Sequence, residues 1–318
     1  MTVHVFGSIN IDQIYRVPHL VRPGETLSSL DLQSVLGGKG ANQSVALARA
    51  GAAVAHLGRI GEADAHRLET LSRAGVDIDG VERVAGTSGH AIIQVDDGGE
   101  NAIVLHGGAN RGFDRAALQG LLGGAREGDW LLMQNECDGL QAAFDIAAER
   151  GLRIAFNPAP MHATVVDLPL EHLALLIVNE TEAAMLCGLE DGPIEAAALA
   201  RIDAALAERC PHAIRVLTLG GRGAQLATGS GTGTERFLAS PPPVEVVDTT
   251  GAGDTFTGFL LAALVAGLPA EQALRRAVVA GSLAVSVSGA TPSIPSAAAV
   301  DAALDAAPNT TSNATPRA

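Results

Sequence analysis

Short apolar runs alternate with Ala/Leu-rich amphipathic stretches along most of the chain. The runs, bounded by Gly, Asn or Asp, predict buried strands at Val3–Ile9, Val54–Ile60, Trp130–Met133, Leu152–Phe156, Leu173–Val178 and Ala213–Leu219. The stretches between most of them predict helices at Ala41–Ala50, Ala65–Ala74, Arg115–Leu122, Leu140–Arg150, Glu180–Cys187 and Glu195–Arg209. After Val247 the pattern indicates helices alone, at Ala252–Ala266, Ala270–Val287 and Ser296–Ala306. Strands that are apolar on both faces and alternate with helices are typical of a mostly parallel sheet covered by helices on both sides.

Two regions break this α/β rhythm. Asp12–Gln33 and His90–His106 alternate loosely between apolar and polar residues, and Asp97-Gly98-Gly99 has the composition of a turn. We predict antiparallel strands there, forming a small β-sheet lid from about residues 11–34 and 88–106. The rest of residues 1–307 forms one α/β body. The Thr, Asn, Pro and Ala residues of 308–318 predict a disordered tail.

Composition narrows the class of protein. Of 318 residues, 47% are hydrophobic and 18% charged, enough apolar residues for a sizeable core. The 21 Lys and Arg against 35 Asp and Glu give a net charge of −14, which argues against nucleic acid or an anionic membrane as partner. No leader or membrane-spanning run is visible, so we expect a cytoplasmic protein. Three cysteines without a C-x-x-C pair predict neither a disulfide framework nor a zinc site.

The strongest local signal is the segment Asp248-Thr249-Thr250-Gly251-Ala252-Gly253-Asp254, which joins a strand-like run to a long apolar helix. Two glycines at a helix start leave backbone N–H groups open to an anion, and the helix dipole favours negative charge there. A carboxylate at such a place repels an anion unless it has a task. Accepting a proton from a hydroxyl that attacks a phosphoryl group is a task that fits Asp254. A capping Asp in a Gly turn is the alternative.

Polar residues suited to a sugar lie in two other places. In Leu36-Gly37-Gly38-Lys39-Gly40-Ala41-Asn42-Gln43, the glycines bring backbone close to a ligand, and Lys39 and Asn42 share one face of a helix start. The spacing is not that of a Walker P-loop. Asn10 and Asp12 follow the first strand on one side of the chain, and Glu136 follows the strand at Trp130–Met133, where a ligand crevice is expected. Asx-turns and a solvated Lys are the structural alternatives.

Two further segments have weaker signals. Asn179-Glu180-Thr181-Glu182 follows a buried strand, and its carboxylates suit a hydrated Mg²⁺, although acids are also usual in the first turn of a capped helix. Thr218-Leu219-Gly220-Gly221-Arg222-Gly223 is a Gly-rich turn that could wrap a nucleotide.

Taken together, these motifs resemble the ribokinase-like, PfkB-type carbohydrate kinases from about Val3 to Ile294. The segments starting at Gly37 and at Asp248 resemble the two signatures of that family, and Asn179–Glu182 resembles its N-x-x-E magnesium motif. Gly289-Ala290-Thr291-Pro292-Ser293-Ile294-Pro295 resembles its monovalent-cation loop. The resemblance implies a three-layer α/β/α sandwich with a β-sheet lid, often dimeric through that lid. The implied reaction is transfer of phosphate from ATP to a sugar hydroxyl, most specifically to D-ribose.

The family's roles carry over residue by residue. The resemblance implies that Asp254 is the catalytic base, with Gly251, Ala252 and Gly253 as the anion hole. It implies a sugar site formed by Asn10, Asp12, Gly38, Lys39, Asn42, Glu136 and Asp254. It implies a nucleotide site at Asn179, Thr218, Gly220, Gly223 and Gly253, with Glu182 holding Mg²⁺ largely through water. Potassium ligands are implied at Asp248, Thr250, Ala284, Val287, Gly289 and Ser293.

Several alternatives remain at this point. The acceptor could be fructose, 2-keto-3-deoxygluconate or a nucleoside, although a nucleoside would favour aromatic stacking and the lid region offers only Tyr15. Val278 stands where many members have Asn or His near adenine, which leaves the nucleotide preference open. A sugar sensor without catalysis would have lost Asp254 or the glycines before it. A Rossmann dehydrogenase would need G-x-G-x-x-G after the first strand, which instead ends in Gly7-Ser8-Ile9-Asn10.

Overall fold

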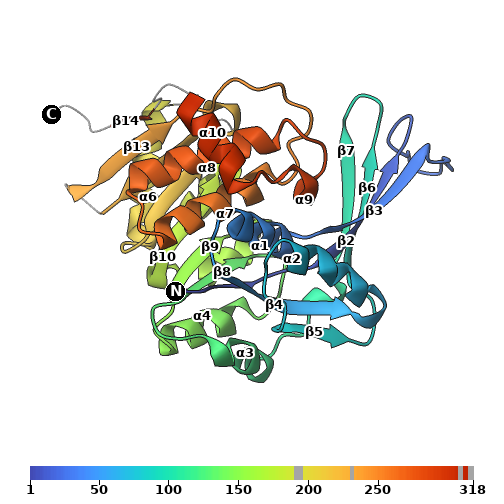
Figure 1. The fold of residues 1–318 in the computed structure, drawn as a ribbon, viewed down its shortest axis with the longest axis horizontal. Coiled ribbons are helices and arrows are strands. Elements are labelled where there is room, and N and C mark those ends of the chain that lie inside the picture. The colour runs from blue at the N-terminus through green and yellow to red at the C-terminus, as the bar shows by residue number, and fades with distance from the viewer. Residues whose placement is uncertain (190–195, 230–232, 307–310, 314–318) are drawn as a thin grey trace.

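A ten-stranded, mostly parallel sheet forms the centre of the molecule (Figure 1). The computed structural model describes residues 1–189, 196–229, 233–306 and 311–313. The strand order is β14-β13-β12-β11-β10-β9-β8-β1-β4-β5. The bounds are β1 Val3–Phe6, β4 Val54–Gly61, β5 Val81–Val84, β8 Trp130–Gln134, β9 Arg153–Asn157, β10 Leu173–Asn179, β11 Ile214–Thr218, β12 Ala224–Thr228, β13 Glu235–Ala239 and β14 Thr311–Asn313.

Helices cover both faces of this sheet and bury two separate apolar cores. Successive residues of a strand point to opposite faces, so Trp130 and Leu132 join one core while Leu131 and Met133 join the other. The first core is closed by α1 Lys39–Arg49, α2 Glu69–Arg73, α7 Ala252–Val265, α8 Ala270–Ala284 and α10 Ala297–Ala306. The second is closed by α3 Arg115–Leu121, α4 Leu140–Glu149, α5 Glu180–Cys187 and α6 Ala196–Arg209. The three-layer α/β/α sandwich predicted from the sequence is therefore confirmed.

A second sheet of four strands projects from the body as the predicted lid (Figure 1). Its order is β3-β2-β6-β7, with bounds β2 Asn10–Arg16, β3 Asp31–Gly37, β6 Gly89–Val95 and β7 Asn101–His106. The prediction of purely antiparallel strands is wrong for the central pair, because β2 and β6 run parallel. They can do so because a long stretch of the body, including β4 and β5, separates them in the chain, whereas a tight turn would force antiparallel pairing.

Other differences from the sequence prediction lie at the sheet edges and helix ends. The strands β5, β12 and β13 were not predicted. β12 runs antiparallel to β11, and β13 runs antiparallel to β12. The predicted helix Ala65–Ala74 is instead a 3₁₀ segment, Glu62–Leu68, followed by α2. Thr311–Asn313 pair with β13, so the prediction of disorder is wrong for these three residues, whose backbone groups find partners on a free sheet edge. The remainder of 307–318 lies outside the described residues.

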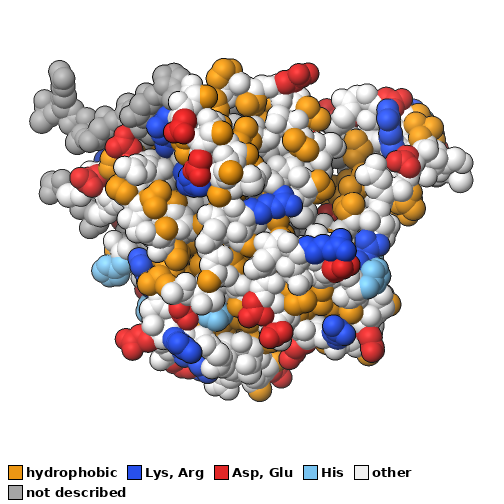
Figure 2. All heavy atoms as spheres, in the orientation of Figure 1, with side chains coloured by type: hydrophobic (Ala, Val, Ile, Leu, Met, Phe, Trp, Pro, Cys, Tyr) orange, Lys and Arg blue, Asp and Glu red, His pale blue; other side chains and the backbone are white. Residues whose placement is uncertain are grey.

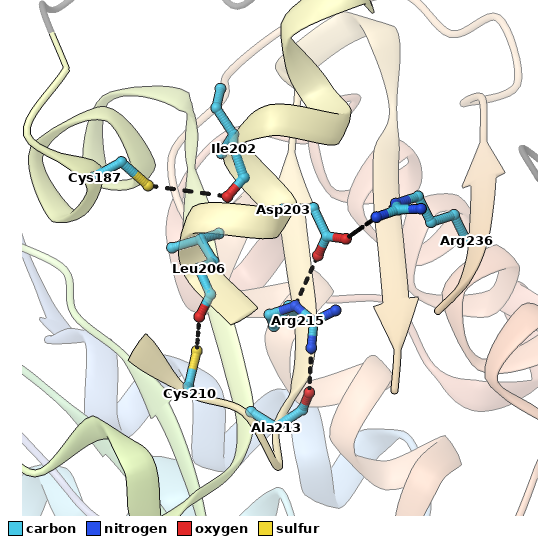
Figure 3. Close-up of polar contacts among 8 residues, drawn as sticks. All are labelled: Cys187, Ile202, Asp203, Leu206, Cys210, Ala213, Arg215 and Arg236. Atoms are coloured by element: carbon cyan, nitrogen blue, oxygen red, sulfur yellow. Dashed lines mark hydrogen bonds and ion pairs between the residues drawn. The ribbon is translucent and has the colours of Figure 1, made fainter. Parts of the chain in front are cut away.

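The three cysteines are free, and two of them lie beside a buried ion cluster. Figure 3 shows the thiols of Cys187 and Cys210 directed at carbonyls of α6, with Cys210 Sγ 2.8 Å from the Leu206 oxygen. In the same region Asp203 accepts from Arg215 Nε at 2.7 Å and from Arg236 Nη2 at 2.8 Å. Burial raises the pKa of Cys210 to about 11. These free thiols act as small packing groups.

No helix in the described part of the chain is long and apolar enough to cross a membrane. On the face in Figure 2, acidic and basic side chains are interspersed.

Candidate active site

The start of helix α7 is packed unusually close to helix α1. Gly258 lies one turn after Asp254, and a Cβ at this position would come within 2.4 Å of the Ala46 Cβ and 2.8 Å of the Leu47 nitrogen. Asn42 and Gln43 lie one turn before these two α1 residues. The close crossing therefore brings the two α1 amides to the Asp254 carboxylate.

The Asp254 carboxylate is buried and accepts from both of these amides. Asn42 Nδ2 donates to Oδ2 at 3.0 Å, and Gln43 Nε2 donates to Oδ1 at 2.9 Å. Asp254 belongs to the first turn of α7, whose N-cap is Gly251 at φ 76°. This left-handed conformation favours glycine, and a Cβ there would also lie 2.9 Å from the Ala290 Cα.

The first turn of α7 contains the residues that the sequence predicts to form an anion hole. Ala252 and Gly253 follow the N-cap, and N–H groups in a first turn have no acceptor within their helix. The Ala252 N–H points back to the Thr249 oxygen at 3.3 Å, a long hydrogen bond that an anion could replace. The structure thus brings Gly251, Ala252, Gly253 and Asp254 into one turn at the mouth of a cavity.

The proposed sugar residues gather where β1 and β8 end and the lid begins. Asn10 Oδ1 accepts from Asn110 Nδ2 at 2.7 Å. One oxygen of Glu136 accepts from the Ser8 hydroxyl and, at 3.0 Å, from the Lys39 N–H. Gly38 is the N-cap of α1 at φ 92°, and a Cβ at Gly37 would strike the Asp12 carboxylate at 1.9 Å. Gly38 favours glycine because of its left-handed conformation, and a side chain at Gly37 would displace the Asp12 carboxylate.

Negative charge is concentrated at this site. Burial, with Glu136 and Asp254 nearby, raises the pKa of Asp12 to about 6. The carboxylates of Asp254, Glu136 and Glu182 outweigh burial and raise the pKa of Lys39, which stays cationic. The site therefore holds one ammonium group among four carboxylates. The carboxylates suit the hydroxyls of a polyhydroxy ligand, whereas Lys39 is the group that would attract a phosphate.

Two cavities meet at the start of α7. One, of about 210 Å³, is lined by Lys39, Asn179, Glu182, Thr218, Gly251, Gly253 and Asp254 among others. The other, of about 620 Å³, is mainly apolar and is lined by Gly220, Gly223, Pro241–Pro243, Phe256, Val278 and Ser282 among others. Thr218, Thr249 and Gly253 line both. The arrangement can hold an elongated molecule with a charged end at Asp254 and an apolar end at Val278.

Asn179 and Glu182 form a complete capping box on α5. Asn179 Oδ1 accepts from the Glu182 N–H at 2.8 Å, and Glu182 Oε2 accepts from the Asn179 N–H at 2.9 Å. Burial raises the pKa of Glu182. The helix-cap interpretation is confirmed, and Glu182 also lines the smaller cavity. No cluster of three or more His, Cys, Asp or Glu in the described ranges could hold a metal ion directly.

The Gly-rich turn after β11 lies against β13. Gly223 has φ 93°, and a Cβ there would come within 1.9 Å of the Ala239 oxygen. Gly220, at φ 54°, opens the turn, and Thr218 Oγ1 lies 3.4 Å from the Val178 oxygen. Backbone rather than side chains therefore lines this end of the larger cavity.

The predicted cation loop contacts Asp248. Asp248 Oδ2 accepts from the Gly289 N–H at 2.8 Å and Oδ1 from the Thr250 N–H at 2.9 Å. Burial alone would raise the pKa of Asp248, but the hydrogen bonds from Thr250 and Gly289 outweigh it and lower the pKa. Ser293 Oγ donates to the Ala290 oxygen at 2.8 Å, and the Val287 N–H donates to the Ala284 oxygen at 3.2 Å. Asp248, Thr250 and Gly289 are thus brought together.

Several polar residues of the site received no role from the sequence. Asn110, Gln134 and Asn157 are buried amides, and Gln43 and Thr291 were noted only as letters within motifs. Gln134 and Asn157 end β8 and β9, so the reasoning that selected Glu136 after β8 applies to them as well. Asn110 ends a short 3₁₀ segment, Gly108–Asn110, and no sequence signal marked it.

The fold and this constellation define a phosphotransferase site, and comparison with known proteins agrees. Residues 2–297 match the family model described as "pfkB family carbohydrate kinase". The chain belongs to the pfkB family of carbohydrate kinases, enzymes that transfer a phosphoryl group to a sugar hydroxyl.

Several relatives within this family are ribokinases. The chain is 35% identical to a ribokinase of Haemophilus influenzae, over 92% of this chain and 95% of that protein. It resembles the crystal structure of a Cryptococcus neoformans ribokinase in complex with ADP, with TM-score 0.80, 36% identity and coverage of 95% and 99%. It also resembles the Arabidopsis thaliana ribokinase complexed with ribose and ATP, with TM-score 0.79, 31% identity and coverage of 95% and 98%.

Proposed function

We propose that this protein is an ATP-dependent kinase of D-ribose that forms D-ribose 5-phosphate and ADP. The observation that carries the proposal is the Asp254 carboxylate, buried in the first turn of α7 beside Gly251–Gly253. It lines the smaller of two cavities, which meet at the neighbouring Gly253. The choice of ribose as acceptor and ATP as donor follows from the ribokinase relatives named above. A cytoplasmic location, expected from the sequence, belongs to the same proposal.

In this proposal Asp254 is the general base. A ribose hydroxyl placed against its free lone pairs loses a proton to the carboxylate as the oxygen attacks the terminal phosphorus. The N–H groups at Gly251–Gly253 and the positive end of α7 stabilise charge on the transferring phosphoryl group. Lys39 adds a cation at the same place.

We assign the sugar to Asn10, Asp12, Gly38, Lys39, Asn42 and Glu136. Carboxylates accept hydrogen bonds from vicinal hydroxyls, whereas an amide side chain can accept from one hydroxyl and donate to the next. The nucleotide would occupy the larger cavity, with its phosphates toward Gly253 and Asn179 and its base toward Val278.

The test of the proposal is a panel of acceptors and donors. Phosphorylation should be fastest with ribose and ATP, and slower with 2-deoxyribose, fructose, 2-keto-3-deoxygluconate and nucleosides. If another acceptor were phosphorylated faster than ribose, that acceptor would be the substrate in place of ribose. If the protein transferred a phosphoryl group to none of these acceptors, the proposal would be wrong.

Asp12 allows a separate prediction, because its raised pKa opposes folding. Because the pKa of Asp12 rises from 3.8 to about 6 on folding, its ionised form lowers the free energy of unfolding. This loss has its full size above pH 6 and disappears as the pH falls toward 4. Asp12→Asn should therefore raise the free energy of unfolding by about 1–3 kcal/mol at pH 7, and much less at pH 4.5. It should also weaken ribose binding by about tenfold or more.

Denaturant unfolding at the two pH values and calorimetry with ribose measure both effects. Asp31→Asn, on exposed β3 of the same lid, is the control and should change neither. An unchanged ribose affinity in Asp12→Asn would remove Asp12 from the sugar site.

We propose that Glu182 helps to hold Mg²⁺ through water. A carboxylate that is held in the helix cap and lines the phosphate cavity suits a cation that keeps most of its waters. When bound, the ion would neutralise phosphate charge. The chain's own contribution is to hold the carboxylate in place through the capping box.

We also propose a monovalent-cation site, K⁺ in preference to Na⁺, at the Asp248 loop. Asp248 and Thr250, with the carbonyls around Ala284, Val287, Gly289 and Ser293, offer one carboxylate and several weak oxygen donors, a set that suits a large, weakly hydrated ion. This loop packs on the Gly251 N-cap, so an ordered loop would preorganise the anion hole.

Turnover should therefore rise several-fold when K⁺ replaces Na⁺ at constant ionic strength, because each preorganised donor is worth about 10²–10³ in rate. Steady-state rates at saturating ribose and Mg·ATP measure the effect, and Asp248→Ala should abolish the difference. Equal rates of the parent enzyme in the two salts would show that the loop is only structural.

We propose a homodimer through the lid. Apolar side chains of the lid are exposed, among them Leu30, directly before β3, and the strand residues Leu32, Ile103, Val104 and Leu105. Figure 2 shows hydrophobic side chains over the lid, at the upper right of the view. Sedimentation analysis tests this: the parent chain should be dimeric, and Val104→Glu should be monomeric.

A further inference from the structure

The Asp254 carboxylate is held by a buried polar network that extends well beyond the residues assigned to ribose or ATP. Asn42 and Gln43 donate to its two oxygens, and each of these amides is itself fixed by further buried partners. We propose that Gln43 and Thr291 are positioning residues that hold the Asp254 carboxylate in the orientation for accepting a proton. This inference rests on the proposed function of Asp254 as base.

Gln43 is fully buried, and every polar atom of its side chain amide is engaged. Its Nε2 donates to Asp254 Oδ1 at 2.9 Å and to Asn157 Oδ1 at 3.1 Å, while its Oε1 accepts from Gln134 Nε2 at 2.7 Å. Both amide hydrogens and the oxygen therefore have partners. If the amide were flipped, its oxygen would face the Asp254 and Asn157 oxygens, which cannot donate. Only one orientation of the amide therefore satisfies the network.

The orientation of Gln43 is set from the central sheet. Asn157, at the end of β9, donates from Nδ2 to the Ile177 backbone oxygen at 3.0 Å. Its Oδ1 must then face Gln43 and accept from it. The chain of bonds thus runs from a β10 carbonyl through two amides to Asp254, and its starting point is a rigid strand.

Thr291 fixes the second amide. Its hydroxyl has one proton and lies 2.9 Å from Asn42 Oδ1, closer than the 3.3 Å to the Leu36 oxygen. A hydroxyl that donates to Oδ1 leaves the Asn42 NH₂ group pointing at Asp254 Oδ2. Thr291, Asn42 and Asp254 are all buried, so water does not substitute for a lost partner at no cost.

The two bonds act on different oxygens of one carboxylate. Because the donors are successive residues of a single helix, rotation of the carboxylate would break both bonds together. Each oxygen keeps a lone pair for the sugar hydroxyl. Small displacements of reacting groups cost about 10²-fold in rate, so the network should be visible in kcat.

The first experiment compares three threonine variants. Thr291→Val removes the hydroxyl with little change of shape and should lower kcat for ribose phosphorylation by about 10- to 100-fold, while Thr291→Ser should restore kcat to near the parent value. Thr255→Val is the matched control. It is a buried threonine next to Asp254 whose hydroxyl has no hydrogen-bond partner within the described structure, so kcat should not change.

The second experiment uses Gln43→Met, which keeps length and apolar contacts. We expect kcat to fall by about 10- to 100-fold, with the Kd for ribose measured by calorimetry changed by less than about threefold, because Gln43 is not a sugar ligand in the proposed site. ADP binding and thermal unfolding verify that each variant is folded. The threonine series tests the proposal on its own if Gln43→Met does not fold.

Parent-like kcat in Thr291→Val, an equal loss in Thr291→Val and Thr255→Val, or failure of Thr291→Ser to restore turnover would each overturn the inference. So would a Gln43→Met variant that loses ribose affinity in proportion to kcat. These failures differ from failure of the proposed function, which would appear as a parent enzyme that does not phosphorylate ribose.

Discussion

Asp254→Asn should lower turnover by about 10²–10⁴, the range for loss of a general base. The change keeps the shape of the side chain and leaves Gly251–Gly253 in place, so ATP and ribose should still bind. It replaces one acceptor oxygen by an NH₂ group, so either Asn42 or Gln43 loses its hydrogen bond to this residue. Single-turnover rates and calorimetric titrations separate the chemical step from binding.

Asp114→Asn is the control for this change. Asp114 is the exposed N-cap of α3 and lines neither cavity of the site, and Asn is an equally good cap, so turnover should not change. If Asp254→Asn retained more than about a tenth of the parent turnover, the loss would be smaller than the smallest effect of removing a general base. Asp254 would then not be the base.

Gly258→Ala should damage both stability and catalysis, because the added methyl group has no space between α1 and α7. Its Cβ would lie 2.4 Å from the Ala46 Cβ and 2.9 Å from the Ala46 carbonyl carbon, and backbone cannot rotate away. Overpacking of this kind costs about 1–3 kcal/mol. The helices must separate, which draws Asn42 and Gln43 from Asp254 and should lower kcat by about 10²-fold.

Gly120→Ala tests the same substitution in helix α3, where a Cβ would meet no atom within 4 Å. It should stabilise the protein slightly through helix propensity, by less than about 1 kcal/mol. Chemical denaturation and steady-state kinetics of the two variants decide the matter. A Gly258→Ala variant as stable and as active as the parent would show that the close crossing is not required.

The main architecture could be predicted from the sequence because its strands are buried on both faces. Continuous apolar runs such as Leu173–Val178 have no other stable place than the middle of a covered sheet. The antiparallel strand β12 was missed because Ala224–Thr228 is short and follows a glycine turn, so its pattern resembles a loop. The strand β13, which pairs with β12, was missed as well. The parallel pairing of β2 with β6 depends on the path of the chain between them, which cannot be predicted from the pattern of apolar and polar residues within each strand.

The candidate site was predictable where residue type and strand end coincide, as for Asp12, Glu136 and Glu182. Its buried amides were not, because Gln and Asn in an apolar context have no distinctive spacing. Gln43 is positioned by contacts with residues more than 90 and 200 positions away, Gln134 and Asp254. Such long-range partners become visible only when the helices and strands are placed in space.

The outermost strand of the lid has a practical consequence for handling the protein. Within the described residues β7 has a neighbour on one side only, and its sequence, Asn101-Ala102-Ile103-Val104-Leu105-His106, carries no Lys, Arg, Asp, Glu or Pro. Natural edge strands usually have such residues, which prevent pairing with another chain. Here a row of backbone donors and acceptors is left beside exposed apolar side chains. Where no second copy covers the lid, the protein is therefore prone to strand-to-strand aggregation that begins at β7, and heating should expose this tendency before the body of the enzyme unfolds.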